Sequence, residues 1–134
     1  MNWNVCEKRV RTTGKGSQRK GRAAELELSR ILQSHGYPVK AGRAQSYGEV
    51  PDLSGLPGVH IEAKRCENLR LSEWMAQAER DAKRFGGLPA VFFRRNRESW
   101  NVVMPLTAWL KIYKRAFPGD FGRFEPPGKE SGMK

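Results

Sequence analysis

The segment from Asp52 to Arg65 constrains the fold most, because it predicts two short strands joined by a tight turn. Residues 52–55 and 59–65 flank Pro57 and Gly58, which are turn-forming residues. Successive side chains of a strand point to opposite faces. The second strand places Val59, Ile61 and Ala63 on one face and His60, Glu62 and Lys64 on the other. We therefore expect a hairpin strand with one buried face, and Glu62 beside Lys64 on its polar face.

The length of the hairpin loop decides whether Asp52 faces Glu62. Directly opposed residues share a face, and a shift of one residue exchanges the faces. A two-residue loop at 57–58 would direct the two carboxyl groups apart, whereas a three-residue loop at 56–58 pairs Asp52 with Glu62. Three-residue loops commonly end in a left-handed glycine, which Gly58 can supply. The sequence therefore predicts a bulged or three-residue connection.

Other segments show helical or strand periodicity and extend this hairpin into a mixed fold. We expect helices from Arg19 to His35, from Ser72 to Phe85, and after Thr107, with Ser72 and Thr107 as N-caps. We expect further strands near residues 39–41, 90–94 and 100–104. The apolar contacts predicted for the last helix are Leu110, Ile112, Tyr113 and Phe117. The order is helix, three strands, helix, two strands, helix.

The chain has 134 residues, which is enough for one domain of ordinary size. Residues 1–16 are basic and lack an apolar period, so we expect a flexible arm there, ordered on DNA. A single domain at 17–117 and a disordered tail at 118–134, rich in Gly, Pro and charge, complete the prediction.

Cysteine content and hydropathy predict a soluble protein of the cytoplasm. Cys6 and Cys66 are far apart and lack metal-binding spacing, so we interpret them as reduced thiols. No apolar run approaches the roughly 18 residues that span a bilayer, and the N-terminus lacks the apolar stretch of a signal peptide.

The net charge of +11 favours nucleic acid as a partner. Seven basic residues and no acid lie between Lys8 and Arg22, and residues 83–97 hold a second acid-free basic block with five. Such blocks attract phosphate polymers, although a solubility surface is the alternative interpretation. The candidate DNA-binding residues are Lys15, Arg19, Lys20, Arg22, Arg43 and Arg65.

Asp52, Glu62 and Lys64 form a set suited to phosphodiester hydrolysis. This reaction needs a nucleophilic water and neutralisation of charge on the phosphate, and a divalent cation serves both needs. Mg²⁺ prefers hard oxygen ligands, which two facing carboxylates provide. Lys64 could orient the nucleophile or stabilise the transition state. A surface ion pair within Glu-x-Lys is the alternative interpretation of those two residues.

Glu25 borders the buried face of the first helix and is a third candidate carboxylate. On a helical wheel it lies on the stripe that contains Leu28 and Leu32. The alternatives are a salt bridge to Arg22 or a hydrogen bond to Ser29 on the helix surface.

Four motifs in order carry a resemblance to a known family. They are Lys20 to Leu28 (KGRAAELEL), His35-Gly36-Tyr37, Ser46 ahead of Pro51-Asp52-Leu53, and Ile61-Glu62-Ala63-Lys64. Across residues 18–105 the chain resembles the archaeal-type Holliday junction resolvases and their phage and bacterial relatives, in the PD-(D/E)xK nuclease superfamily. The spacer between Asp52 and Glu62 is short, and residues 89–97 match no family pattern.

This resemblance implies an α/β (α+β) restriction-endonuclease-like core, with a central mixed five-stranded sheet flanked by helices. It also implies a homodimer that cuts four-way DNA junctions with Mg²⁺, or with Mn²⁺ as an alternative ion. Glu25, Asp52 and Glu62 would be the metal ligands and Lys64 the catalytic lysine. Ser46 and Gln77 are further catalytic candidates, each with a solvated surface residue as the alternative.

Two other functions remain open at the level of sequence. One is a PD-(D/E)xK nuclease that acts on other DNA in restriction or repair, and the other is a non-catalytic basic DNA-binding module. A dimer would suit symmetric incision of a two-fold junction. Its candidate surfaces include Leu26 and the C-terminal helix around Trp109.

Overall fold

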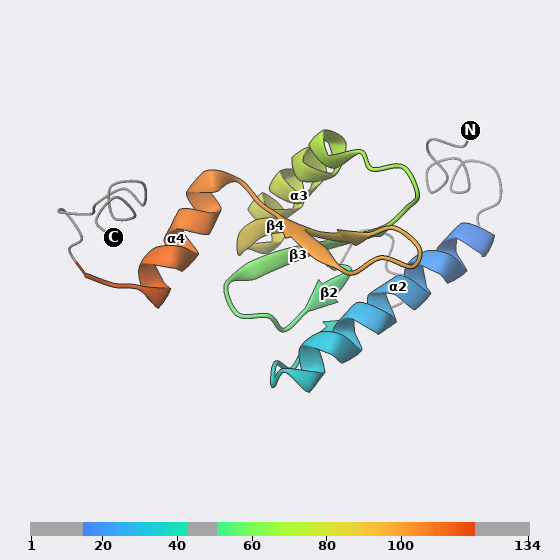
Figure 1. The fold of residues 1–134 in the computed structure, drawn as a ribbon, viewed down its shortest axis with the longest axis horizontal. Helices are drawn as coiled ribbons and strands as arrows, with labels where there is room; N and C mark the ends of the chain where they lie inside the picture. The colour runs from blue at the N-terminus through green and yellow to red at the C-terminus, as the bar shows by residue number, and fades with distance from the viewer. Residues whose placement is uncertain (1–14, 43–50, 120–134) are drawn as a thin grey trace, which may run out of the picture.

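The protein folds into a five-stranded mixed sheet with a helix on each face. The structure is a computed structural model that describes residues 15–42 and 51–119, with side chains from residue 21 onward. The elements are α2 (Lys15–Ser34), β1 (Lys40–Ala41), β2 (Leu53–Ser54), β3 (Val59–Arg65), α3 (Leu71–Phe85), β4 (Leu88–Arg94), β5 (Asn101–Val103) and α4 (Leu106–Ala116). Figure 1 shows α2 and α3 on opposite sides of the strands.

The strands lie in sequence order, β1-β2-β3-β4-β5. β3 and β4 are parallel, and the other neighbouring pairs are antiparallel. A parallel pair needs a long crossover connection, and α3 supplies it. The expected mixed five-stranded sheet with flanking helices is therefore confirmed.

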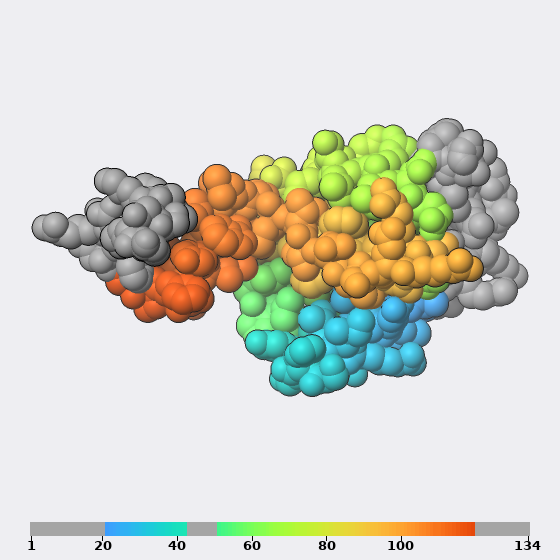
Figure 2. All heavy atoms as spheres, in the orientation of Figure 1, coloured from blue at the N-terminus to red at the C-terminus, as the bar shows by residue number. Residues whose placement is uncertain are grey.

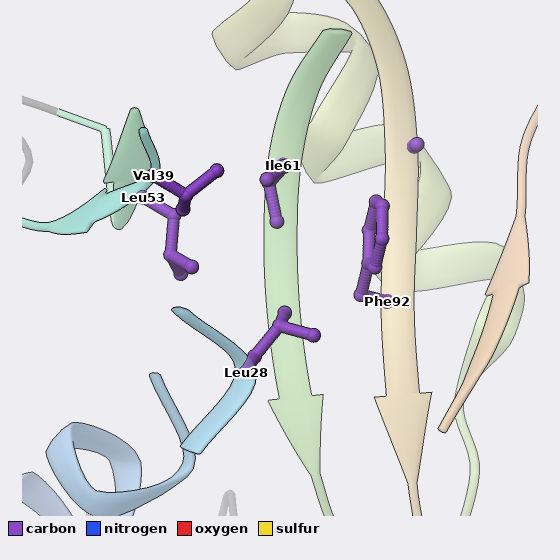
Figure 3. Close-up of a cluster of buried hydrophobic side chains, with 6 residues drawn as sticks. Leu28, Val39, Leu53, Ile61 and Phe92 are labelled. Carbon is purple, nitrogen blue, oxygen red and sulfur yellow. The ribbon is translucent and has the colours of Figure 1, made fainter. Parts of the chain in front are cut away.

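Alternation along β3 and β4 divides the core between the two helices. On the α2 side, Leu28 packs with Leu53, Ile61 and Phe92, as Figure 3 shows. On the α3 side, the buried cluster contains Cys66, Trp74, Ala78 and Val91. Because Ile61 belongs to the α2 core, strand alternation puts His60 and Glu62 on the α3 side.

An ion pair ties α2 to the end of β4. The Arg94 Nη2 atom lies 3.0 Å from Glu27 Oε1, and the Arg94 side chain is 11% exposed. The Arg94 guanidinium also lies over the Trp100 ring, 5.8 Å from the centroid. Glu27 therefore attaches α2 to the end of β4.

Several local expectations are wrong. α2 begins at Lys15, earlier than Arg19. Ser72 and Thr107 are not N-caps, because α3 and α4 begin one residue before them and neither helix has a side-chain cap hydrogen bond. The Arg70 side chain forms an ion pair with Glu73 in the first turn of α3.

The expected burial of α4 is also wrong. Leu110, Ile112, Tyr113 and Phe117 are all exposed, and Ala108 is the buried residue of this helix. Figures 1 and 2 show α4 projecting from the sheet, where it covers neither face. Its apolar residues therefore have no core to join within the described part of the chain.

Cys66 is disulfide-bonded in the structure, so the expectation of a reduced thiol is wrong for this residue. Two isolated cysteines without a motif carry no spacing signal that could have indicated a bond. Cys6 lies outside the described residues. Within the described ranges, no helix combines the length and apolar character needed to cross a bilayer.

Candidate active site

The β2–β3 hairpin places Asp52 opposite Glu62. Leu53 pairs with Ile61 in antiparallel register. Asp52, one residue before Leu53, therefore faces Glu62, one residue after Ile61. The Val59 amide donates a hydrogen bond to the Leu56 carbonyl (3.2 Å), and Gly58 has a φ of +78°. The predicted three-residue loop with a left-handed glycine is confirmed.

Asp52 and Glu62 line one hollow of about 330 Å³ between the hairpin and α3. The other lining residues are Pro51, His60, Gln77, Arg80, Asp81, Arg84 and Phe85. Gln77, Asp81 and Phe85 are spaced by four residues along α3, so they present one face of that helix to β3. The predicted candidate Gln77 thus lines the same hollow as both carboxylates.

Glu62 is a buried acid whose charged neighbours are Lys64, Asp52 and Asp81. Its residue is 3% exposed, and its Oε2 atom lies 3.5 Å from Lys64 Nζ. Burial raises the pKa of Glu62 from 4.5 to about 7, against the opposing effect of the Lys64 ammonium group. The site therefore resists a negative charge on Glu62 unless more positive charge is brought in.

Glu25 and Asp52 are electrostatically linked across α2 and the hairpin. Burial, followed by repulsion from Asp52, raises the pKa of Glu25 from 4.5 to about 7. Burial also raises the pKa of Asp52, while Lys64 and His60 oppose the rise. Glu25 is outside the residues that line the hollow, but its carboxyl group responds to Asp52 and Lys64.

The residues that could have held Glu25 on the helix surface have other partners. The Arg22 guanidinium donates to the Gly42 carbonyl, and the Ser29 hydroxyl donates to the Leu26 carbonyl at 2.9 Å. The positive charge of Arg22 still lowers the pKa of Glu25, so it favours the ionised form of that carboxyl group.

His60 and Asp81 are polar residues of the site that the sequence patterns did not single out. Ligand atoms of His60, Glu62 and Asp81 all lie within 4.8 Å of one another. Strand alternation already placed His60 on the face of Glu62 and could have indicated its position. Asp81 had no comparable signal, because its approach depends on how α3 packs on the sheet.

The predicted DNA-binding residues are only partly described. Arg22 is engaged with the Gly42 carbonyl, and Arg65 Nε donates to Asn96 Oδ1 at 3.0 Å. Lys15, Arg19 and Lys20 lie in α2, but their side chains are outside the described ones. Ser46 and Arg43 fall in residues 43–50, which are also outside the described ranges.

Residues 16–119 match the family described as "Phage putative PDDEXK endonuclease". The chain belongs to this family. Pro51-Asp52 and Glu62-Ala63-Lys64 supply the letters of the PD-(D/E)xK pattern in order. Membership makes the chain a nuclease of the PD-(D/E)xK type and confirms the suspected superfamily.

A solved structure confirms the fold independently. The PD-(D/E)xK chain is similar to Hjc, a Holliday junction resolvase from the archaeal hyperthermophile Archaeoglobus fulgidus, with a TM-score of 0.50 and 23% identity. The similarity covers 63% of this chain and 72% of Hjc. No curated protein sequence matches the chain.

Proposed function

We propose that this PD-(D/E)xK nuclease is a Mg²⁺-dependent DNA endonuclease that resolves four-way junctions as a homodimer. The observation that carries the proposal is the position of Asp52 opposite Glu62, with the Lys64 ammonium nitrogen 3.5 Å from the Glu62 carboxylate. The similarity to Hjc, which is a Holliday junction resolvase, favours the junction as substrate. Its place of action would be the cytoplasm of a prokaryotic or phage-infected cell.

The carboxyl groups of the site fit a divalent cation. Asp52, which is half-buried, and Glu62, which is buried, offer carboxylate oxygens as metal ligands in one hollow. The charge of Asp52 also acts on the carboxyl group of Glu25. Each has a raised pKa because burial opposes its negative charge, and a cation would relieve that cost. Bound by these residues, Mg²⁺ would supply a Lewis acid for the phosphate and a means of making water nucleophilic near neutral pH.

Lys64 would act on the reacting phosphate. Its side chain is 26% exposed and leaves the same strand face as Glu62, so its ammonium group can contact both the carboxylate and a substrate. A fixed positive charge there stabilises the extra negative charge of the transition state. Gln77, from the adjacent face of α3, would hold water or a phosphate oxygen, and we keep Ser46 as a candidate for the same task.

DNA binding would use basic residues around the hollow. The net charge of +11 favours the polyanion, and exposed Arg80 lines the hollow next to the carboxylates. Lys15, Arg19, Lys20 and Arg43 remain candidates from the sequence. Arg22 and Arg65 donate hydrogen bonds to Gly42 and Asn96, so they would hold the DNA-binding surface in place as well as contribute positive charge to it.

The exposed face of α4 would join two copies of the chain. Leu106, Trp109, Tyr113 and Phe117 are between 45% and 67% exposed, and three of these four are aromatic. Apolar patches of this kind mark interaction surfaces. A two-fold dimer would hold two sites at a fixed separation, as paired incision of a junction requires.

The decisive experiment compares a labelled four-way junction with a linear duplex of the same sequence and length. We expect Mg²⁺-dependent cutting of the junction, loss of cutting in Glu62→Gln and Asp52→Asn, and retained junction binding by both variants. Equal cutting of both substrates would instead support restriction or repair of ordinary DNA. Binding without cutting in the wild type, with any divalent ion, would leave the non-catalytic DNA-binding module.

A further inference from the structure

We propose that His60, Glu62 and Asp81 form a second divalent-cation site that selects a transition-metal ion over Mg²⁺. The site shares Glu62 with the proposed catalytic centre, so it rests on the proposed function to that extent. Its other two ligands, one from β3 and one from α3, lie outside the Pro-Asp and Glu-x-Lys motifs. The ion would sit on the α3 side of Glu62, next to the centre that includes Asp52.

The sheet and α3 bring the three ligands together. His60 and Glu62 are two residues apart on β3 and share the face that α3 covers. Asp81 reaches them from α3, and one ligand atom from each residue lies within 4.8 Å of the other two. Metal bonds of about 2.0–2.2 Å need ligand atoms somewhat closer than this, and binding of the ion would require small side-chain rotations.

The buried imidazole of His60 is an independent indication of a ligand. The residue is 4% exposed, and its Nε2 atom is buried with no hydrogen-bond partner among the described residues. A buried polar atom normally has a partner, and leaving one without a partner is unfavourable. A cation at this position would accept the nitrogen lone pair and remove that deficiency.

Packing holds the imidazole in a fixed plane. The Phe85 ring stacks on His60 with centroids 6.0 Å apart and an angle of 9° between the planes. Phe85 follows Asp81 by one helical turn, so the same face of α3 orients the imidazole and supplies the carboxylate. A preorganised ligand loses little conformational freedom when it binds an ion.

The ligand chemistry determines which ion is favoured. Mg²⁺ is held by oxygen atoms, whereas an imidazole nitrogen favours first-row transition metals. One nitrogen and two carboxylates suit Mn²⁺, Co²⁺ or Zn²⁺ with water in the remaining positions. Asp52, Glu62 and Glu25 offer only oxygen, so the two neighbouring centres would differ in preference.

Pulsed electron paramagnetic resonance with Mn²⁺ tests the site directly, because coordination by imidazole gives a ¹⁴N coupling that carboxylates cannot give. We expect this coupling in the wild type and in Asp52→Asn, which removes a ligand of the oxygen centre. We expect it to disappear in His60→Gln. In Asp81→Asn the affinity of the nitrogen-coupled ion should fall about tenfold or more.

Glu79→Gln is the matched control for Asp81→Asn, because Glu79 is an exposed acid on α3 that lies outside the hollow. It should leave both the ¹⁴N coupling and the Mn²⁺ affinity unchanged. Should His60→Gln fail to fold by circular dichroism, Asp81→Asn on α3 still decides the matter. Absence of ¹⁴N coupling in the wild type, or an unchanged Mn²⁺ affinity in folded Asp81→Asn, would overturn the inference.

Cleavage assays separate this inference from the proposed function. If the wild type cuts no DNA but shows ¹⁴N coupling, the proposed function fails and the second site stands. If Mg²⁺ supports cutting and Mn²⁺ shows no nitrogen coupling, the second site fails alone. Loss of the coupling in Asp52→Asn would mean a single shared centre, which also contradicts the proposal.

Discussion

The Lys64 ammonium nitrogen lies 3.5 Å from Oε2 of Glu62, on the face of β3 that α3 covers. Glu62 is buried and Lys64 is partly exposed, so the pair extends from the interior to the solvent. An ion pair that served stability alone would gain little from such a position, because a buried charge is costly. The arrangement suits the proposed roles, in which the Glu62 carboxylate binds a cation and the Lys64 ammonium group contacts a phosphate.

Replacing Lys64 tests its proposed action on the phosphate. In Lys64→Gln we expect single-turnover junction cleavage to fall by roughly 10²–10³-fold, the usual effect of losing one charge-stabilising group. Junction affinity in a gel-shift assay should change much less. Lys83→Gln is the control, because Lys83 is an exposed lysine of α3 outside the hollow. Equal losses in the two variants would indicate a general charge effect.

Gly58 tests the dependence of the site on the hairpin loop. Its φ of +78° is unfavourable for other residues, so Gly58→Val should destabilise the fold by about 1–3 kcal/mol. Because the loop sets the pairing of Asp52 with Glu62, cleavage should fall further than stability alone explains. Gly21→Ala is the control: this exposed helical glycine has open space around it and should gain about 0.5–1 kcal/mol. Urea denaturation and cleavage rates give both quantities.

The stability of the metal-free protein should fall as the pH rises from about 4.5 to 7. The pKa values of Glu25 and Glu62 are raised from 4.5 to about 7 by folding, so the folded chain holds more protons in this range. The stabilisation is complete below the unfolded pKa and is lost as the pH passes the folded one. Urea denaturation at pH 5 and pH 8, with a chelator present, measures the change.

Glu62→Gln isolates the contribution of Glu62 to this pH dependence. His60, whose pKa is lowered by burial, acts in the opposite direction over part of the range, so the comparison must be with wild type at each pH. The variant should lose part of the decline between pH 5 and pH 8. The same decline in both proteins would contradict the raised pKa of Glu62.

Charged substitution on α4 tests the proposed dimer. Trp109→Glu places a charge within the exposed aromatic row of Trp109, Tyr113 and Phe117. The ring centroids are 4.8 Å apart for Trp109 and Tyr113 and 4.9 Å apart for Tyr113 and Phe117. We expect a dimer for the wild type and a monomer for this variant by light scattering. Thr107→Glu introduces the same charge at another exposed position of the helix and should remain dimeric. A monomeric wild type at micromolar concentration would refute the interface.

The local pattern of residues 52–65 was enough to predict the hairpin that carries the candidate active site. Alternation fixed the faces of β3, and Gly58 fixed the loop, so the pairing of Asp52 with Glu62 could be predicted from the order of residues alone. The reason is that both properties depend on neighbours along the chain: a strand repeats every two residues, and a left-handed turn position favours glycine. The helical stripe that buries Leu28 was equally predictable.

The first residues of the helices were less predictable, because a side chain that is able to cap a helix does not by itself fix where the helix begins. Ser72 and Thr107 have suitable side chains, yet α3 and α4 each start one residue earlier and are not capped by side chains.

Arg22 and Arg65, interpreted as DNA contacts, donate hydrogen bonds to oxygen atoms of residues that lie far away in sequence. A residue type alone does not show which partner lies nearby.

Tertiary structure alone decided which groups meet beyond the hairpin. The sequence determined a β3 face with His60, Glu62 and Lys64, but the approach of Asp81 to that face depends on how α3 crosses the sheet. It also decided that the apolar residues of α4 remain exposed, although their spacing resembles that of a packed helix. Periodicity specifies which side chains share a face, whereas burial and contact depend on what the rest of the chain brings to that face.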